Sequence, residues 1–234
     1  MDVININNLT KDYKWFKAIK NVNINIRKGS IYGFIWANGA WKSTTLKILS
    51  GLIRKTSWNI KVLWKNWNID TLKNIGSVIE YPSLYEKNTG YENLLMHAFL
   101  TWSKKEKIVE ILKVVGLNNV AAKKQTEKYS LWMKQRLAIW IALINDPDIL
   151  ILDEPTNGLD VEWIKEIREL LIKLWTLGKT IIISSHQLSE IEKACTHIWV
   201  IKKWQMKFDW TKNEFMSKWK KWESIEEIYL NIVS

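Results

Sequence analysis

Several features that would define a protein class are scarce in this chain of 234 residues. It has one cysteine, Cys195, so no disulfide can form within the chain, which suits a reducing cytoplasm. No run reaches the roughly 18 apolar residues that a membrane-spanning helix needs, and the N-terminal residues do not resemble a secretory signal. Hydrophobic residues still make up 47%, enough for a sizeable core, so we expect a globular protein.

Glycine is the most informative shortage. The chain has 9 glycines but 16 tryptophans, although tryptophan is normally among the rarest residues. Several tryptophans stand in polar contexts, such as Lys203-Trp204-Gln205 and Asp209-Trp210-Thr211. Contexts of this kind are typical of turns, where glycine is common because it reaches positive φ without steric cost. Tryptophan therefore stands at positions where glycine would be expected.

The charge is strongly positive, with a formal net charge of +11. One interpretation is a nucleic-acid or anionic membrane partner. The other is a solvated, lysine-rich surface. The lysines are scattered along the chain, which favours the second interpretation, and we expect no nucleic-acid partner.

Strand and helix patterns alternate along the chain, which predicts an α/β protein with a mainly parallel sheet. We expect strands at 3–6, 22–26, 31–35, 60–63, 77–79, 149–152, 180–184, 198–201 and 205–208. We expect helices at 42–49, 132–144 and 161–174, and helices that begin near Thr89, Ser103 and Ser189. The helical block at about 89–145 is predicted to be an insertion between strands.

A phosphate-binding loop is predicted between the strand at 31–35 and the helix that follows it. Its candidate residues are Trp36, Ala37, Asn38, Gly39, Ala40, Trp41, Lys42, Ser43, Thr44 and Thr45. With glycine at Trp36 and Trp41 they match the pattern G-x-x-x-x-G-K-[ST], in which backbone N–H groups and a helix N-terminus surround phosphate. Lys42 would reach the β- and γ-phosphates of ATP, and the Ser43 hydroxyl would bind Mg²⁺. The alternative is an ordinary strand-turn-helix that contains a lysine.

Two acids end the apolar run at 149–152. Asp153 at the end of this strand could hold Mg²⁺. Glu154, one residue further, could act as the general base that activates water. The alternative is a pair of acids that cap the following helix.

Residues 129–136 resemble the signature sequence of ABC transporter ATPases, with departures at Leu131, Trp132 and Met133. Leu131 and Met133 are similar to the bacitracin- and lantibiotic-resistance subgroup of that family, and Trp132 read as glycine completes that pattern. The resemblance implies that Ser130 and the backbone at Trp132 contact the γ-phosphate held by a second subunit.

The resemblance continues in order along the chain. Residues 155–160, which end at Asp160, resemble the D-loop of the dimer interface, and His186 resembles the switch histidine that contacts the γ-phosphate. Tyr13 matches the aromatic residue that stacks on adenine. Glu80 stands where the family usually has glutamine, and its carboxylate could ligate Mg²⁺ or position water.

This resemblance implies a P-loop NTPase (RecA-like) core with an antiparallel β subdomain and an inserted helical subdomain, all in one ATP-binding domain over residues 1–234. It also implies an ATPase that uses ATP and Mg²⁺ and pairs with a second ATP-binding subunit as a homo- or heterodimer. We expect it at the cytoplasmic face of the membrane, where it drives a permease on a separate chain, with antimicrobial peptides as a candidate cargo for export. The alternative is a catalytically dead regulatory subunit.

Three hypotheses account for the tryptophans. They could form an interfacial membrane-binding surface, or they could mark a degenerate, inactive ATPase. The third hypothesis is a gene whose UGA codons specify glycine, so that a standard conceptual translation writes tryptophan. We favour the third, because one cause explains all sixteen positions.

Overall fold

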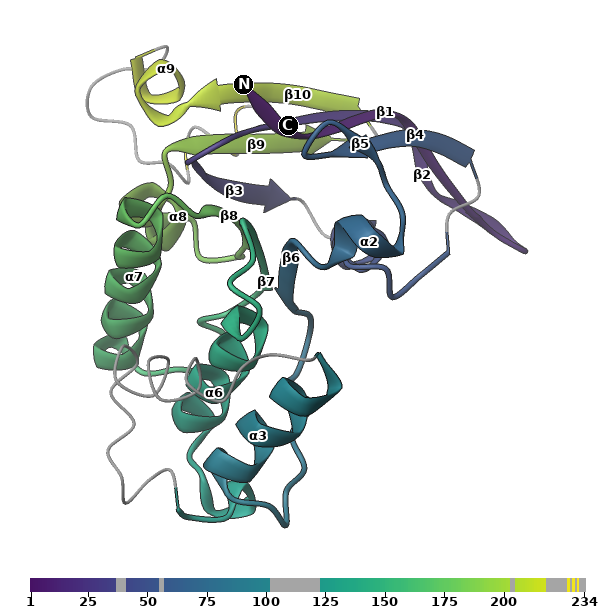
Figure 1. Ribbon diagram of the computed structural model, residues 1–234. Coiled ribbons are helices and arrows are strands. Elements are labelled where there is room, and N and C mark those ends of the chain that lie inside the picture. The colour runs from purple at the N-terminus through teal and green to yellow at the C-terminus, as the bar shows by residue number, and fades with distance from the viewer. Residues whose placement is uncertain are drawn as a thin grey trace.

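The computed structural model describes residues 1–36, 41–54, 57–101, 123–202 and 205–217, together with Glu227, Tyr229 and Asn231. Its strands form two sheets (Figure 1). One is antiparallel, in the order β2-β1-β4-β5. Its strands are β1 (Asp2–Tyr13), β2 (Phe16–Arg27), β4 (Ser57–Val62) and β5 (Lys65–Asn66).

The second sheet has six strands in the order β10-β9-β3-β8-β7-β6. They are β3 (Ile31–Trp36), β6 (Ile75–Val78), β7 (Ile149–Asp153), β8 (Thr180–Ser184), β9 (His197–Lys202) and β10 (Gln205–Thr211). All neighbours pair in parallel except β9 and β10. Every residue of β7 and β8 is buried, as expected for central parallel strands that are covered on both faces.

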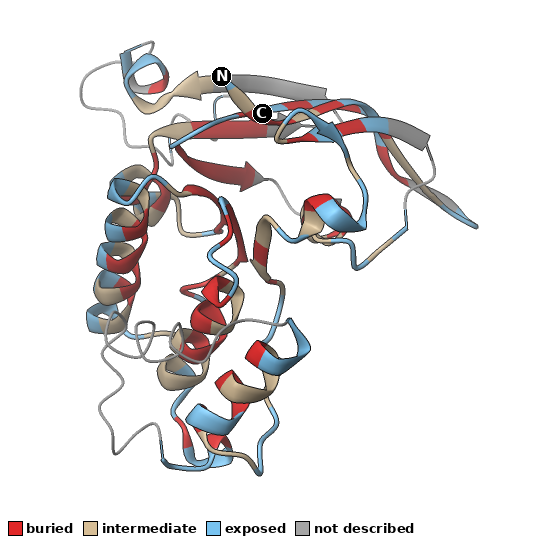
Figure 2. Cartoon of the chain, viewed as in Figure 1, coloured by how far each residue is buried: buried red, intermediate tan, exposed pale blue. Residues whose placement is uncertain are grey.

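Helices cover the parallel sheet and extend below it in Figure 1. The helices among the described residues are α1 (Trp41–Leu49), α2 (Ile69–Leu72), α3 (Gly90–Leu100), α6 (Leu131–Leu143), α7 (Val161–Thr176), α8 (Leu188–Ala194) and α9 (Lys212–Ser217), with the 3₁₀ turn η1 (Thr126–Lys128). The helix α7 has one buried face and one exposed face (Figure 2). Its buried residues recur at helical spacing: Ile164, Ile167, Leu170, Leu171 and Leu174.

The parallel sheet separates two hydrophobic cores, because alternate residues of a strand point to opposite faces. In β7, Leu150 and Leu152 belong to the core that contains the apolar residues of α6 and α7. Ile149 and Ile151 belong to the other core, with the antiparallel sheet and α1. The central strands are therefore buried on both faces, and their carboxyl ends lie at one edge of the sheet.

The predicted fold class is confirmed, and most elements lie within a few residues of their predicted positions. The predicted strand at 3–6 is longer, because β1 continues to Tyr13 after a register shift between Ile6 and Leu9. Asn8 has a φ of 55° there, and this bulge breaks the alternation that marks a strand. The structure adds the short elements β5 and α2, which are not among the predicted elements.

Two described helices, α3 and α6, lie within the predicted insertion. Thr89 caps α3 through a reciprocal capping box with Glu92, as predicted, and α6 begins one residue earlier than expected. The helix expected to begin near Ser103 lies outside the described residues. The insertion at about 89–145 therefore stays a prediction. In the part of the chain that the structure describes, no helix is long and apolar enough to cross a membrane.

Candidate active site

The carboxyl ends of β3, β8 and β7 lie next to one another, because these strands are adjacent and parallel. The helix α1 begins at Trp41, shortly after β3 ends at Trp36. This edge of the sheet therefore collects residues from three distant parts of the sequence. Open α/β sheets bind their ligands at this edge.

Glu154 is the centre of the site. Its Oε1 atom pairs with the Lys42 ammonium, and its Oε2 atom lies 2.8 Å from Nδ1 of His186. The backbone N–H of His186 also donates to Oε2, at 3.2 Å. The structure thus brings together the three residues that the sequence predicts as catalytic.

The backbone holds Glu154 in an unusual conformation. Its φ is 51°, in the left-handed region that a glutamate rarely adopts. Its N–H donates to the Ser184 hydroxyl at 2.9 Å and lies 3.2 Å from the Ser184 carbonyl oxygen. Strain of this kind persists when the surroundings fix it, and it is common at active sites.

The charge of Glu154 is stabilised by its neighbours. Burial of the carboxyl group raises its pKa, but the hydrogen bonds and charges of Lys42 and His186 outweigh burial and hold the pKa below the usual glutamate value. The carboxylate is therefore ionised at neutral pH, as a general base must be.

Asp153 is buried at the end of β7 and accepts a 2.5 Å hydrogen bond from the Ser184 hydroxyl. Ser43, Thr44 and Thr45 lie in the first turns of α1, and the latter two are buried. Among the described residues, no group of three or more His, Cys, Asp or Glu side chains could enclose a metal. Hydroxyl and carboxylate oxygens nevertheless fit Mg²⁺, which is usually held by one or two protein groups, phosphate and water.

Glu80 follows β6 and also has a left-handed backbone, with a φ of 63°. Its carboxylate lies 2.5 Å from the ammonium of Lys47 on α1. No sequence motif points to Lys47. Glu80 therefore has a partner that offsets its negative charge, and its role as a metal ligand stays a prediction.

The predicted signature and D-loop lie side by side at two helix N-termini. Ser130 caps α6, where its hydroxyl accepts from the N–H of Met133 at 3.3 Å, and Asp160 is the N-cap residue of α7. The ring of Trp132 lies 4.2 Å from that of Trp163, between ring centres. This contact joins the first turns of α6 and α7.

The structure describes Tyr13 and only part of the predicted phosphate loop. Tyr13 ends β1 with 38% of its surface exposed, and the ammonium of Lys11 lies 4.9 Å from the centre of its ring. Ala37, Asn38, Gly39 and Ala40 lie outside the described residues. Trp36 ends β3 and Trp41 begins α1, so the two glycine positions of the predicted loop lie at the end of the strand and at the start of the helix.

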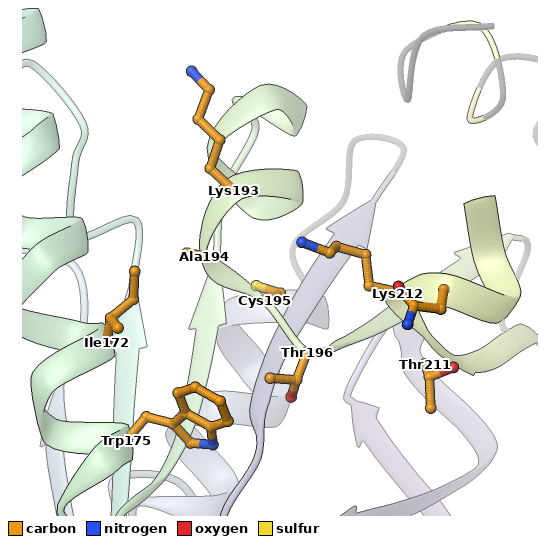
Figure 3. A pocket seen from close by; sticks show the side chains of 9 residues that line it. Ile172, Trp175, Lys193, Ala194, Cys195, Thr196, Thr211 and Lys212 are labelled. Carbon is orange, nitrogen blue, oxygen red and sulfur yellow. The ribbon is translucent and has the colours of Figure 1, made fainter. Parts of the chain in front are cut away.

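A separate hollow of about 330 Å³ lies beside α8, and the Trp175 indole lines it (Figure 3). Its two cations already have partners: Lys193 pairs with Glu190, and Lys212 donates to the carbonyl oxygen of Glu192. Burial raises the pKa of the Cys195 thiol, which keeps it protonated and unreactive. This hollow has none of the groups predicted to bind nucleotide.

Comparison with known proteins identifies the family of the chain. Residues 19–157 match the family model described as "ABC transporter". The chain is 46% identical over 190 residues to the lantibiotic transport ATP-binding protein SrtF of Streptococcus pyogenes, covering 81% of this chain and 82% of SrtF. It is also 46% identical over 204 residues to the bacitracin transport ATP-binding protein BcrA of Bacillus licheniformis, covering 85% of this chain and 66% of BcrA.

Solved structures have the same fold. An ATP-binding subunit of an ABC transporter superposes with a TM-score of 0.86 at 23% identity, covering 98% of this chain and 99% of that one. A dimeric ATP-binding cassette in a post-hydrolysis state, bound to ADP and Pi, gives a TM-score of 0.79 at 27% identity, covering 89% and 98%. The chain therefore belongs to the ABC transporter family, as the ATP-binding and ATP-hydrolysing subunit of a transporter.

Proposed function

We propose that this subunit binds ATP with Mg²⁺ at the carboxyl ends of β3, β8 and β7, and that Glu154 is the general base for hydrolysis. The contact of Glu154 with both Lys42 and His186 carries this proposal. Lys42 would bind the β- and γ-phosphates, and Ser43 and Asp153 would hold the metal. When bound, Mg²⁺ would offset the charge of the phosphates.

The two carboxylate oxygens of Glu154 have different partners, which suggests different roles. Oε2 is held by two groups of His186, its ring and its backbone N–H. Oε1 is held by Lys42, whose ammonium a phosphate would attract. Nucleotide binding would thus free Oε1, and this oxygen would accept the proton of the attacking water while His186 keeps the carboxylate in place.

We propose two partners for this subunit, a second ATP-binding subunit and a permease. Ser130, Trp132 and Asp160 lie at the N-termini of α6 and α7, where backbone N–H groups favour an anion. We assign these residues to the γ-phosphate held by a second ATP-binding subunit, in a homo- or heterodimer. A permease on a separate chain would anchor this pair to the cytoplasmic face of the membrane.

The cargo proposal rests on the relatives. SrtF is named for lantibiotic transport and BcrA for bacitracin transport, and we assign this chain to the export of antimicrobial peptides of that kind. The test is the growth of its native host in bacitracin and in nisin, with the gene deleted and then restored. Restoration by the wild-type gene but not by E154Q supports the proposal.

A control antibiotic that acts inside the cell should affect all strains equally. If the deletion leaves sensitivity to both peptides unchanged while the purified protein hydrolyses ATP, the cargo proposal is wrong and the ATPase remains. If the purified protein does not hydrolyse ATP, the catalytic proposal fails.

A further inference from the structure

The turn between β4 and β5 requires a residue that tolerates a left-handed backbone. Val62 pairs with Lys65, which leaves Leu63 and Trp64 as a two-residue loop. Both have positive φ, 47° and 65°. This is the pattern of a type I′ hairpin turn, whose second position strongly prefers glycine. A bulky residue at positive φ is an outlier, and the Trp64 side chain lies largely in solvent, with 53% of its surface exposed.

Three other tryptophans have buried indole N–H groups without a partner, at Trp132, Trp140 and Trp199. Trp140 and Trp199 are fully buried, in α6 and β9 respectively. A buried tryptophan usually has a hydrogen-bond partner for its N–H, and an orphaned donor needs an explanation. Glycine at these positions would remove all three orphaned groups.

Two further tryptophans, Trp36 and Trp41, stand at the two glycine positions of the phosphate-loop pattern. Three kinds of observation therefore favour glycine over tryptophan. They are the positive φ at Trp64, the buried indole N–H groups without a partner, and the phosphate-loop pattern of the sequence. By contrast, Trp67 and Trp175 donate to the carbonyl oxygens of Leu49 and Gly29, so their contacts do not argue against tryptophan.

We propose that the residues at Trp36, Trp41, Trp64, Trp132, Trp140 and Trp199 are glycines in the protein made by its cell of origin. The cause would be a UGA codon that this cell decodes as glycine. The effect is a phosphate loop with the glycines that its pattern requires. The evidence at Trp64, Trp140 and Trp199 does not depend on the proposed function.

The test is mass spectrometry of the protein purified from its own cell. The intact mass and the sequenced peptides that cover the six positions should show glycine. Tryptophan at Trp64, Trp140 or Trp199 in native peptides would overturn the inference. The residues found at positions 67 and 175 in native peptides are also compared with the codons of the gene. This comparison shows whether the codon, rather than the position in the fold, determines which residue is inserted.

A second measurement uses recombinant protein. The chain as printed and a variant with all six positions changed to glycine are compared for binding of a fluorescent ATP analogue. The glycine variant should bind at least tenfold more tightly, and equal affinity would contradict the inference at the phosphate loop. Native protein that contains glycine but does not hydrolyse ATP would overturn the proposed catalysis while leaving the recoding intact.

Discussion

Changing Trp64 to glycine should stabilise the chain that has tryptophan at this position, although the change removes a large side chain. The φ of 65° places residue 64 in the left-handed region, which costs a residue with a Cβ atom about 1–2 kcal/mol. Glycine avoids this cost but loses more conformational entropy on folding, about 0.5–1 kcal/mol. Because the two effects oppose each other, we expect a net gain of about 1 kcal/mol.

The matched control is W64A, which removes the indole but keeps the Cβ atom. Since the Trp64 side chain is 53% exposed, W64A should stay within about 0.5 kcal/mol of the printed chain. Thermal denaturation should then place W64G about 2–4 °C above W64A, as expected for about 1 kcal/mol in a protein of this size. If the two variants melt together, the backbone at residue 64 is not strained and the reasoning from the hairpin fails.

Three further predictions concern the site. E154Q in the glycine-containing protein should retain ATP binding and lose about 10²–10⁴-fold in turnover, since only water activation is removed; undiminished phosphate release would contradict this. Lys42 and His186 hold the pKa of Glu154 in the folded protein below the ordinary glutamate value of about 4.3. The ionised Glu154 should therefore stabilise the fold above about pH 4.3, and this stabilisation should be lost as the pH falls through the pKa of the folded protein. Urea titrations of wild type and E154Q, from about pH 7 down to about pH 3, measure this difference, which should shrink toward acid. E80Q should make activity measurably less dependent on Mg²⁺, because a carboxylate near the phosphates repels them unless the metal offsets its charge. The Mg²⁺ concentration for half-maximal activity should fall by up to about fivefold, since the ion pair with Lys47 limits the effect to about 1 kcal/mol; identical titrations would mean that Glu80 does not lie at the metal.

The central strands could be predicted from the sequence because burial on both faces produces a continuous apolar run. The runs at 149–152 and 180–184 correspond to β7 and β8. The full length of β1 could not be predicted, because the bulge at Asn8 shifts the register and hides the strand's continuation. The strand β5 has two residues, too few to show any period.

The catalytic residues could be predicted because each belongs to a motif with its own chemistry. Lys42, Glu154 and His186 are far apart in the sequence, and the parallel order of β3, β8 and β7 explains why they meet. Ser184 and Lys47 give no such signal. Ser184 acts by supporting the two acids, and Lys47 is one of many lysines in a basic chain.

Positive φ has different origins at Glu80 and Glu154 than at Trp64. Glu80 and Glu154 have this conformation at strand ends beside α1, and each carboxylate is fixed by an ion pair. Glycine there would relieve the backbone but would remove the charge that the partners hold, so the strain belongs to the site. Trp64 lies in a hairpin turn, where the turn type itself demands glycine. A strained residue whose side chain has an ion-pair partner is therefore explained by the site, whereas a strained residue in a turn that prefers glycine is not. We accordingly expect glycine in place of Trp64 and no change at either glutamate.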